Sequence, residues 1–475
     1  MGERAVRWAP PALVLVLLGW IAARAARPIR DPDDWWHLRL GNDLIAQHSL
    51  ATPAHWSVFA TVDWVPTEPL PEIVAAYVDR WFGLPGLAVL FAVAGMVVVL
   101  TVYVTCRRWA APLPSALATV LTVLAASASL TSRPQLISFV LFPIVISAWL
   151  RTEQDHRVRW WLVPLVWLWS LCHGFWFLGA GYGVLFVVGF ALSRSMSPPV
   201  LLRQGAVAIA SFAVVALNPV GLGVLEAPLA VNSTSQYIAE WARTDLTSLA
   251  ALGALVMLVA TAGLWVATRH GASWPRVLVL VSAVFWTWYA ARTVAVAGLV
   301  VAPLFAAALD RLVRAGNGES TETGAGEGPR RSEMAVLAAA AAVAVIVVGA
   351  LAPSTSDRPG DVPTRLDATL DRLPPGTRVF NAYALGGWIA WRHPDLEQYI
   401  DGLITPYSDR HAHDYTIAEA TEPGWYRVVE ASRAQVALLA DNSALAARLQ
   451  DRGWVVDGTD TGYVLLVPPG DPARS

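Results

Sequence analysis

Residues 84–105 read LPGLAVLFAVAGMVVVLTVYVT, a stretch without a single charged side chain. A helix needs about 20 apolar residues to cross the hydrocarbon core of a bilayer. Comparable runs recur from the N-terminus to about residue 352 and then stop, and the chain is 55% hydrophobic but only 15% charged. Soluble domains carry about 25% charged residues, and single soluble cores stop growing beyond roughly 250–300 residues. The stretch therefore predicts an all-α polytopic membrane protein.

We expect about eleven membrane-spanning helices within residues 1–352. The first run is interpreted as an uncleaved span and not as a signal peptide, because no clear cleavage site follows it. Two runs are short, so these helices are expected to be tilted or to pair with the next segment as a broken hairpin. The predicted spans are 10–26, 84–105, 113–130, 136–150, 160–172, 175–193, 202–218, 246–267, 277–290, 293–309 and 334–352.

Arginine is distributed unevenly between the two sets of connecting segments. Placing the N-terminus in the cytoplasm puts most arginines in inner segments, as the positive-inside rule requires. Residues 27–83 then form the first outer loop, and residues 311–333 form a cytoplasmic linker whose Gly, Ser, Thr and Glu content is typical of flexible chains. Residues 353–475 lie outside. They alternate short β-rich and helical patterns, which predicts a small extracytoplasmic α/β domain. The strands are expected at residues 378–381, 398–401, 435–439 and 463–467.

The first outer loop opens with DPDDWWHL at residues 31–38. One interpretation is structural: Asp31 caps a helix, Pro32 takes its first position, further acids favour the helix dipole, and the tryptophans anchor the membrane interface. Capping does not need three acids, however, nor His37 four residues after Asp33. That spacing places Asp33 and His37 on one helix face, where they could share a metal or deprotonate a hydroxyl. From the residues alone, both interpretations stay open.

Six more polar residues fall in short outer segments of this topology. Charges at membrane boundaries are costly and often functional, and the planar guanidinium of arginine suits phosphate. Each residue alone is more simply explained by helix capping, snorkelling or an ion pair such as Glu240 with Arg243. Their position on one predicted face favours a shared function. They are Arg133, His173, Asn218, Glu240, Arg243 and Arg292.

An acidic pair in a long first outer loop, many spans and an outer C-terminal domain resemble the GT-C glycosyltransferases. These are membrane enzymes such as protein mannosyltransferases, aminoarabinose transferases and oligosaccharyltransferases. Their first loop carries an acidic motif, often Asp-Glu, that acts as base or metal ligand, whereas this chain has Asp33-Asp34. The phrase Asp-Pro-Asp-x-Trp-Trp-His-Leu, with Asn218-Pro219, Glu240-Trp241 and Gly386-Gly387, also resembles uncharacterised bacterial members of that superfamily. The resemblance covers about residues 1–350 and includes no substrate-specific signature.

The resemblance implies an enzyme that moves a sugar from a polyprenyl-phosphate donor, a membrane lipid, to an acceptor outside the cytoplasmic membrane. Asp33 would be the base or metal ligand, with Asp34 or His37 assisting, and Arg292 and Arg133 would hold the donor phosphate. A divalent cation, Mg²⁺ or Mn²⁺, is the expected cofactor, with Asp33 and His37 as its ligands. The acceptor could be a glycan, a lipid or a protein. The net charge of −2 argues against nucleic acid as a partner.

Two other functions stay open. The first is a transporter or flippase of a lipid-linked or small polar substrate. Transporters place ionisable groups at the middle of the membrane and contain repeats of broken helices, whereas the polar residues here cluster at one predicted face and no repeat is visible. The second is a non-catalytic membrane scaffold, which the sequence does not exclude.

Overall fold

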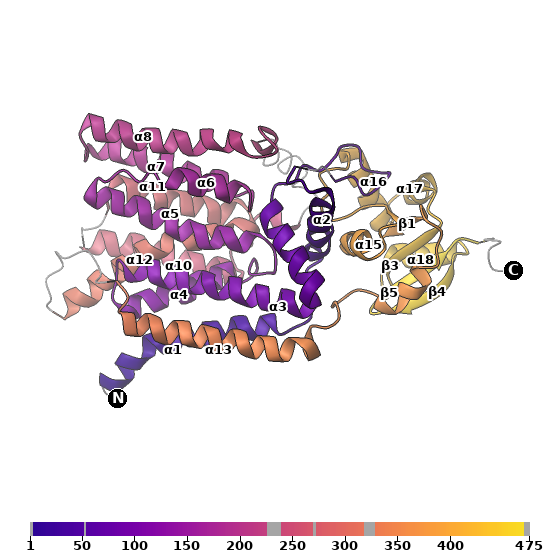
Figure 1. Ribbon diagram of the computed structural model, residues 1–475, viewed down its shortest axis with the longest axis horizontal. Helices are drawn as coiled ribbons and strands as arrows, with labels where there is room; N and C mark the ends of the chain where they lie inside the picture. The colour runs from indigo at the N-terminus through magenta and orange to yellow at the C-terminus, as the bar shows by residue number, and fades with distance from the viewer. Residues whose placement is uncertain (1–2, 52–53, 226–238, 269–271, 318–327, 470–475) are drawn as a thin grey trace. The chain divides into compact units, whose positions relative to one another are not determined.

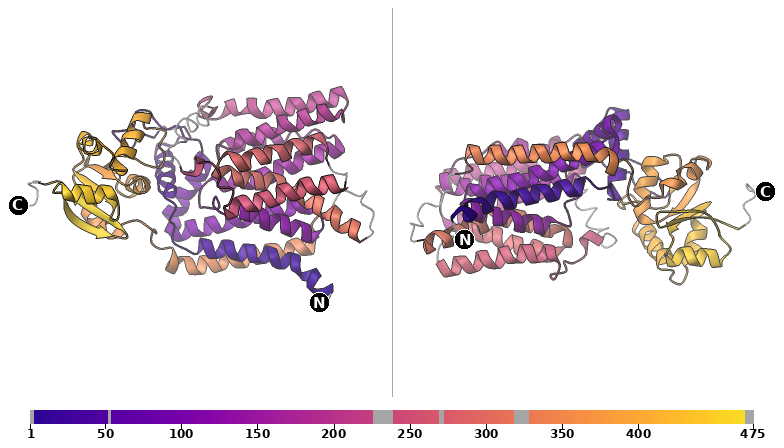
Figure 2. Two further views of the ribbon diagram at one scale, coloured as in Figure 1. Left: turned by 180° about the vertical axis from the view of Figure 1, so that it is seen from behind. Right: turned by 90° about the horizontal axis from the view of Figure 1, so that it is seen from below.

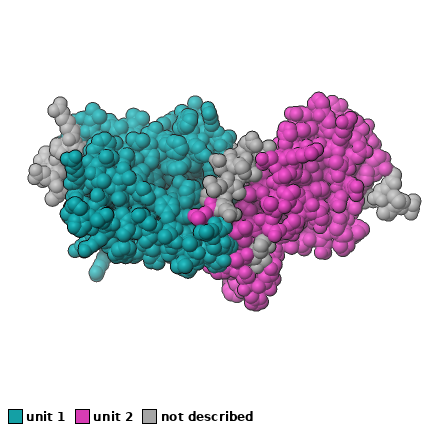
Figure 3. Space-filling model, turned by 90° about the horizontal axis from the view of Figure 1, so that it is seen from above, with its two compact units in different colours: residues 1–27, 88–224, 238–353 teal, residues 28–87, 225–237, 354–475 magenta. Residues whose placement is uncertain are grey.

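The computed structural model describes residues 3–51, 54–225, 239–268, 272–317 and 328–469. The chain divides into two compact units, which Figure 3 shows in separate colours. Unit 1 comprises residues 1–27, 88–224 and 238–353, and unit 2 comprises residues 28–87, 225–237 and 354–475. Residues 28–87, which contain nearly all of the predicted first outer loop, therefore fold together with the C-terminal segment, an association that no sequence pattern indicated.

Unit 1 is a bundle of apolar helices that lie side by side (Figures 1 and 2). Every predicted span falls on one of them. Its connecting segments contain three short 3₁₀ turns in the described part of the chain: η1 (Val214–Leu217), η3 (Ala239–Trp241) and η4 (Ala291–Thr293). The helices are α1 (Glu3–Ala25), the second part of α3 (Pro69–Arg107), α4 (Pro112–Ala126), α5 (Gln135–Asp155), α6 (Leu162–Ser170), α7 (Trp176–Ser193), α8 (Pro198–Ala213), α10 (Leu249–Thr268), α11 (Trp274–Tyr289), α12 (Val294–Gly316) and α13 (Arg331–Thr355).

Seven helices of the described part are long and apolar enough to cross a membrane, and α1 and α4 supply shorter apolar helices. The chain is therefore a multi-pass membrane protein. The span predicted at 160–172 is too long, because α6 has only 9 residues. At 1.5 Å per residue it extends about 14 Å, roughly half of the hydrocarbon thickness.

The central helix of unit 1 is α12, which contacts α4, α5, α10 and α11. All of its residues from Val294 to Ala306 are buried. Small residues let neighbouring helices approach it closely: a Cβ added to Gly298 would lie 2.8 Å from the Cβ of Ala125 on α4. This packing fixes the ends of the helices, and with them the polar connecting segments.

Helix α3 is broken at Gly83, whose φ of 62° and ψ of −163° are essentially confined to glycine. The part before the break carries Glu72, Asp79 and Arg80 and belongs to unit 2. The part after it is free of charge up to Arg107 and forms the membrane span. One continuous segment thus joins a polar helix of unit 2 to the bundle.

Unit 2 contains a five-stranded sheet of order β2-β1-β3-β5-β4. β1 pairs in parallel with β2 and β3, and β5 pairs antiparallel with β3 and β4. The α/β prediction for the C-terminal segment is confirmed. The elements are α2 (Asp33–Gln47), η5 (Thr364–Leu366), α14 (Asp367–Leu370), β1 (Arg378–Asn381), η6 (Tyr383–Leu385), α15 (Gly386–Arg392), β2 (Glu397–Gln398), α16 (Asp409–Glu419), α17 (Trp425–Ser432), β3 (Val436–Ala440), α18 (Ala444–Asp451), β4 (Val455–Asp460) and β5 (Tyr463–Val467).

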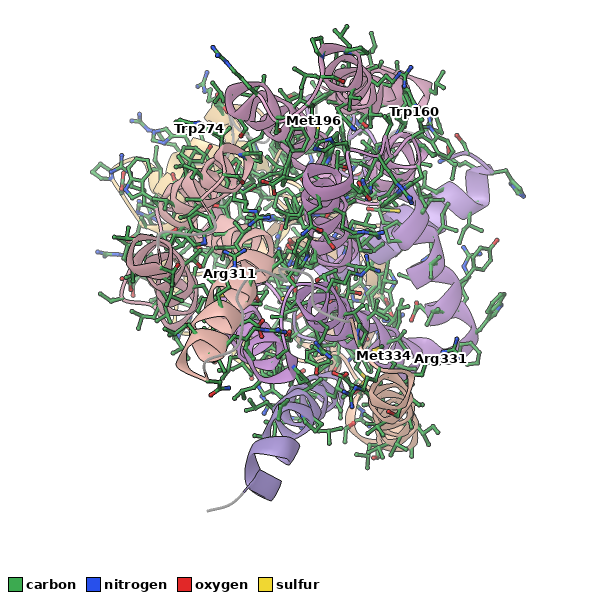
Figure 4. All side chains as sticks on the ribbon, turned by 90° about the vertical axis from the view of Figure 1, so that its left-hand side faces the viewer. Trp160, Met196, Trp274, Arg311, Arg331 and Met334 are labelled. Atoms are coloured by element: carbon green, nitrogen blue, oxygen red, sulfur yellow. The ribbon has the colours of Figure 1, made fainter. Side chains whose placement is uncertain are left out.

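One end of unit 1 gathers arginines of the predicted inner segments. Arg107 pairs with Glu333 (3.0 Å) and Arg276 with Glu153 (2.9 Å), which joins the ends of α3, α5, α11 and α13. Figure 4 looks onto this end of the bundle, where Arg311 also lies. The side of the membrane that this end faces stays a prediction.

Candidate functional site

The first turn of α2 carries the acidic motif of the first loop. Asp31 Oδ1 accepts a hydrogen bond from the backbone N–H of Asp33 at 3.1 Å, so Asp31 has the capping role that the sequence predicts. Asp33 and Asp34 follow in the first turn of the helix, where negative charge favours the helix dipole. Asp33 is half-buried and Asp34 is buried.

Trp35 and Trp36 are buried inside unit 2. The Trp35 ring stacks on Trp391 with a centroid distance of 5.2 Å, and the Trp36 ring meets Trp64 edge-on at 6.4 Å. The interpretation of these two tryptophans as membrane-interface anchors is therefore wrong. Their large apolar surfaces hold α2 against the rest of the unit.

His37 lies one helical turn after Asp33 and meets two carboxylates from the start of α3. Its Nδ1 lies 2.9 Å from Glu72 Oε1 and 3.9 Å from Glu68 Oε2. Glu68 directly precedes Pro69, the first residue of α3, and Glu72 lies in the first turn of that helix. The three ligand atoms all lie within 4.8 Å of one another. This arrangement can bind a cation.

The Glu72 carboxyl group is the most buried member of this cluster, with 1% of its surface exposed. Burial raises its pKa well above the usual value, and the nearby charge of Glu68 raises it further. Its second oxygen, Oε2, has no hydrogen-bond partner among the described residues. An ionised carboxylate in such surroundings needs a compensating positive charge.

Three glycines allow close packing within the segment 386–402 and between this segment and the N-terminal end of α2. A Cβ added to Gly386 would lie 2.0 Å from the carbonyl oxygen of Ile400. A Cβ on Gly387 would lie 3.0 Å from the backbone just before α2, and one on Gly402 would lie 2.6 Å from Asp33 Oδ1. The Gly386-Gly387 motif thus has a steric role, and Asp33 lies against Gly402.

In unit 1, Glu240 bridges two arginines from distant connecting segments. One carboxylate oxygen lies 2.8 Å from Arg133 Nη1, and the other accepts a hydrogen bond from Arg292 Nη1 at 3.1 Å. The Arg292 guanidinium also lies over the rings of Phe175 and Trp241, 5.7 Å and 6.0 Å from their centroids. Its buried Nε has no hydrogen-bond partner among the described residues. Together, the two arginines and Glu240 carry one net positive charge.

His173 is buried beside this cluster. Its Nδ1 accepts a hydrogen bond from the Phe175 backbone N–H at 3.1 Å and lies 3.0 Å from Ser138 Oγ. That hydroxyl accepts a hydrogen bond from Trp169 Nε1 at 2.7 Å. Burial, followed by the charge of Arg292, lowers the pKa of His173 well below its usual value. His173 is therefore neutral near pH 7 and holds its loop in position.

Asn218 and Arg243 make other contacts. The Asn218 side-chain amide donates to the carbonyl and hydroxyl oxygens of Ser170 at 3.2 Å and 3.1 Å, which ties the end of η1 to α6. Arg243 lies over the Trp288 ring at 5.5 Å. The alternative of a Glu240–Arg243 ion pair is therefore wrong.

From the sequence, we did not predict that Glu68 and Glu72 lie beside His37, although the spacing of these residues could have indicated it. Glu68 and Glu72 are four residues apart, as are Asp33 and His37. Both spacings place two side chains one helical turn apart on the same face. The expected metal pair of Asp33 and His37 is a different set: the three groups that converge are His37, Glu68 and Glu72.

Solved structures similar to this chain include membrane glycosyltransferases. The archaeal oligosaccharyltransferase AglB from Archaeoglobus fulgidus, in complex with an inhibitory peptide and a dolichol-phosphate, has a TM-score of 0.57 and 13% identity over 92% of this chain and 70% of that chain. ArnT from Cupriavidus metallidurans in the apo state has a TM-score of 0.52 and 15% identity over 98% of both chains. The same ArnT bound to undecaprenyl phosphate has a TM-score of 0.51 and 14% identity, again over 98% of both chains.

No protein-family model and no curated protein sequence matches the chain. At these low identities, the structural likeness shows a shared fold. The prediction of a helical multi-pass membrane domain with a small C-terminal α/β domain is confirmed, and the fold is shared with the oligosaccharyltransferase AglB and with ArnT.

Proposed function

We propose that this chain, which has the GT-C fold, is a glycosyltransferase that moves a sugar from a polyprenyl-phosphate donor to an acceptor at the outer face of the cytoplasmic membrane. Because one fold hosts many functions, the proposal depends on a site. The observation that carries it is the acidic first turn of α2, with Asp33 and Asp34 one helical turn before the buried His37. Neighbours in fold bind dolichol-phosphate and undecaprenyl phosphate, which supports a lipid-phosphate donor.

Sugar transfer breaks the bond between the sugar C1 and the donor phosphate oxygen and forms a bond from C1 to the acceptor oxygen. The acceptor hydroxyl must lose its proton, so a carboxylate must lie within hydrogen-bond reach of it. Asp31 is engaged in capping, and Asp34 is only 6% exposed, whereas Asp33 is half-buried and more accessible to an acceptor. We assign Asp33 as the base, with Asp34 or His37 assisting.

The proposed donor-phosphate site is the pair Arg133 and Arg292. Two guanidinium groups facing one carboxylate retain a net positive charge, and the fork geometry of arginine matches phosphate oxygens. The Nε of Arg292, which has no hydrogen-bond partner in the described part of the chain, is a further donor. Glu240 holds both arginines in place until the phosphate arrives.

A carrier or flippase is the second candidate function, and its expected signature is a set of ionisable groups at mid-membrane. In unit 1, the Arg133–Glu240–Arg292 cluster instead belongs to connecting segments at the ends of helices. This placement favours a site at the membrane boundary, as sugar transfer to an outer acceptor needs.

The test uses membranes that contain the full-length protein and supply the acceptor, with a panel of radiolabelled undecaprenyl-phosphate sugars as donor. Asp33→Asn preserves size and removes the charge, and we expect transfer to fall by at least about 10²-fold, the low end for general-base catalysis. Asp31→Asn is the matched control. It should cost far less, because asparagine also caps helices well.

Equal small losses in both variants would contradict the assignment of Asp33. Full transfer activity in Asp33→Asn would remove the main support for an enzyme. In that case, movement of the same labelled lipids across proteoliposome membranes would be the next measurement, and activity there would favour the flippase.

A further inference from the structure

The cluster of His37, Glu68 and Glu72 is built from two segments of unit 2 that are held by packing. His37 comes from the buried face of α2, and the two glutamates come from the first turn of α3 and the residue before it. Their ligand atoms, one imidazole nitrogen and two carboxylate oxygens, lie within 4.8 Å of one another. Converging atoms of this kind surround a common point, as metal ligands do.

The charge of the cluster also points to a cation. His37 and Glu72 are 6% and 1% exposed, and the Glu68 side chain is 14% exposed. A cation bound between the imidazole and the two carboxylates would stabilise the ionised form of the buried Glu72 carboxyl group. Glu72 Oε2 provides a second, independent sign, because this buried oxygen has no hydrogen-bond partner among the described residues.

We propose that His37, Glu68 and Glu72 bind a divalent transition-metal ion, and that Zn²⁺ fits the donor set best. Zn²⁺ accepts mixed imidazole and carboxylate ligands, whereas Mg²⁺ and Ca²⁺ prefer oxygen alone. Three protein ligands leave a fourth position of a tetrahedral site for water or a substrate oxygen. The site shares His37 with the Mg²⁺ or Mn²⁺ pair of Asp33 and His37 expected from the sequence, and it does not depend on the transferase activity.

Another buried histidine of unit 2 shows what a purely structural arrangement looks like. His393 contacts Asp371 through Nδ1 at 2.8 Å and Asp367 through Nε2 at 3.4 Å. The two aspartates therefore lie at opposite nitrogens of the ring and do not converge on one point. Asp371 is also 52% exposed. His393 is thus a matched control: buried, flanked by two carboxylates, but unable to share one ion with both.

The experiment measures metal binding by the full-length protein in detergent. Zinc content is determined by mass spectrometry after dialysis, and Zn²⁺ affinity is determined by competition with a chromogenic chelator, with Mg²⁺ as the comparison ion. We expect one Zn²⁺ per chain and weaker Mg²⁺ binding. Changing even an outer-shell partner costs 10–100-fold in affinity, so His37→Gln and Glu72→Gln should each weaken Zn²⁺ binding by at least about 100-fold. His393→Gln should leave the affinity unchanged.

A measurement on the wild-type protein avoids any dependence on folding of the variants. X-ray absorption at the zinc edge should show one imidazole and otherwise oxygen ligands at about 2.0–2.2 Å. Two or more imidazoles, a sulfur ligand, or less than stoichiometric zinc would overturn the site. Equal loss of affinity in His393→Gln and His37→Gln would also overturn it. Because these readouts measure binding, an inactive transferase leaves them unaffected.

Discussion

Asp31, Asp33 and Asp34 lie within four positions of one another, yet their surroundings differ. Asp31 accepts a hydrogen bond from the backbone of the following helix turn, Asp33 lies against Gly402, and Asp34 is only 6% exposed. A short acidic run can therefore divide capping and chemistry between neighbouring residues. This division is the reason that Asp31→Asn is a suitable control for Asp33→Asn.

Arg292 is the residue whose contacts best distinguish a phosphate site from a structural ion pair. If it holds the donor phosphate, Arg292→Ala should weaken binding of undecaprenyl phosphate by about 10- to 100-fold, because a hydrogen bond to a charged group contributes about 1.5–3 kcal/mol. Binding is measured by thermophoresis of the protein in lipid nanodiscs, and the thermal midpoint is recorded for each variant.

Arg243→Ala is the control for this prediction. It removes the same charge from a nearby connecting segment, but Arg243 contacts the Trp288 ring instead of Glu240. We expect little change in binding. A lower thermal midpoint for Arg292→Ala with unchanged binding would make Arg292 a structural residue.

At the scale of elements, α15 packs closely against the chain that follows β2, and this contact depends on the absence of a side chain at Gly386. A methyl group on Gly386 would lie 2.0 Å from the backbone oxygen of Ile400, which cannot turn aside as a flexible side chain can. Overpacking costs typically about 1–3 kcal/mol and occasionally more. We expect Gly386→Ala to lose about 3 kcal/mol or more and to expose residues 354–475 to limited proteolysis.

Gly387→Ala should be milder, because its added Cβ would meet the Pro32 oxygen at 3.0 Å. Gly263→Ala on α10 is the neutral comparison, since nothing lies within 4 Å of its added Cβ and alanine favours helix. The measurement is protease resistance of the full-length protein in detergent, across a temperature series. Wild-type resistance in Gly386→Ala would mean that α15 can shift without loss of the fold.

At the scale of the whole molecule, the charge bias of the connecting segments predicts which side of the membrane each end faces. Helix α13 has 25 residues and is long and apolar enough to cross the membrane. Reporter fusions after Gly324, which lies outside the described residues, and after Ser475 should therefore report opposite sides, with the second outside. The measurement is alkaline phosphatase and fluorescent-protein activity in cells. The same side for both fusions would contradict the topology.

Local properties of the sequence were sufficient to predict most of the helices and strands. A run of about 20 apolar residues is a local feature, so the spans could be found, and the strands expected at Arg378–Asn381 and Tyr463–Val467 are present. The strand expected at 398–401 is instead Glu397–Gln398. Strand β4, Val455–Asp460, was missed because its sequence VVDGTD contains a glycine and two aspartates, which are depleted in strands.

The sequence by itself thus determined the membrane class, the apolar spans, the Asp31 cap and the α/β character of the C-terminal segment, because each depends on neighbouring residues. Only the tertiary structure brought His37 to Glu72, 35 positions away, and Arg292 to Glu240, 52 positions away. Helical periodicity relates residues only three or four positions apart. Contacts between distant side chains depend on how the helices pack and on the path of the connecting segments. In this chain, that packing assembles both candidate sites.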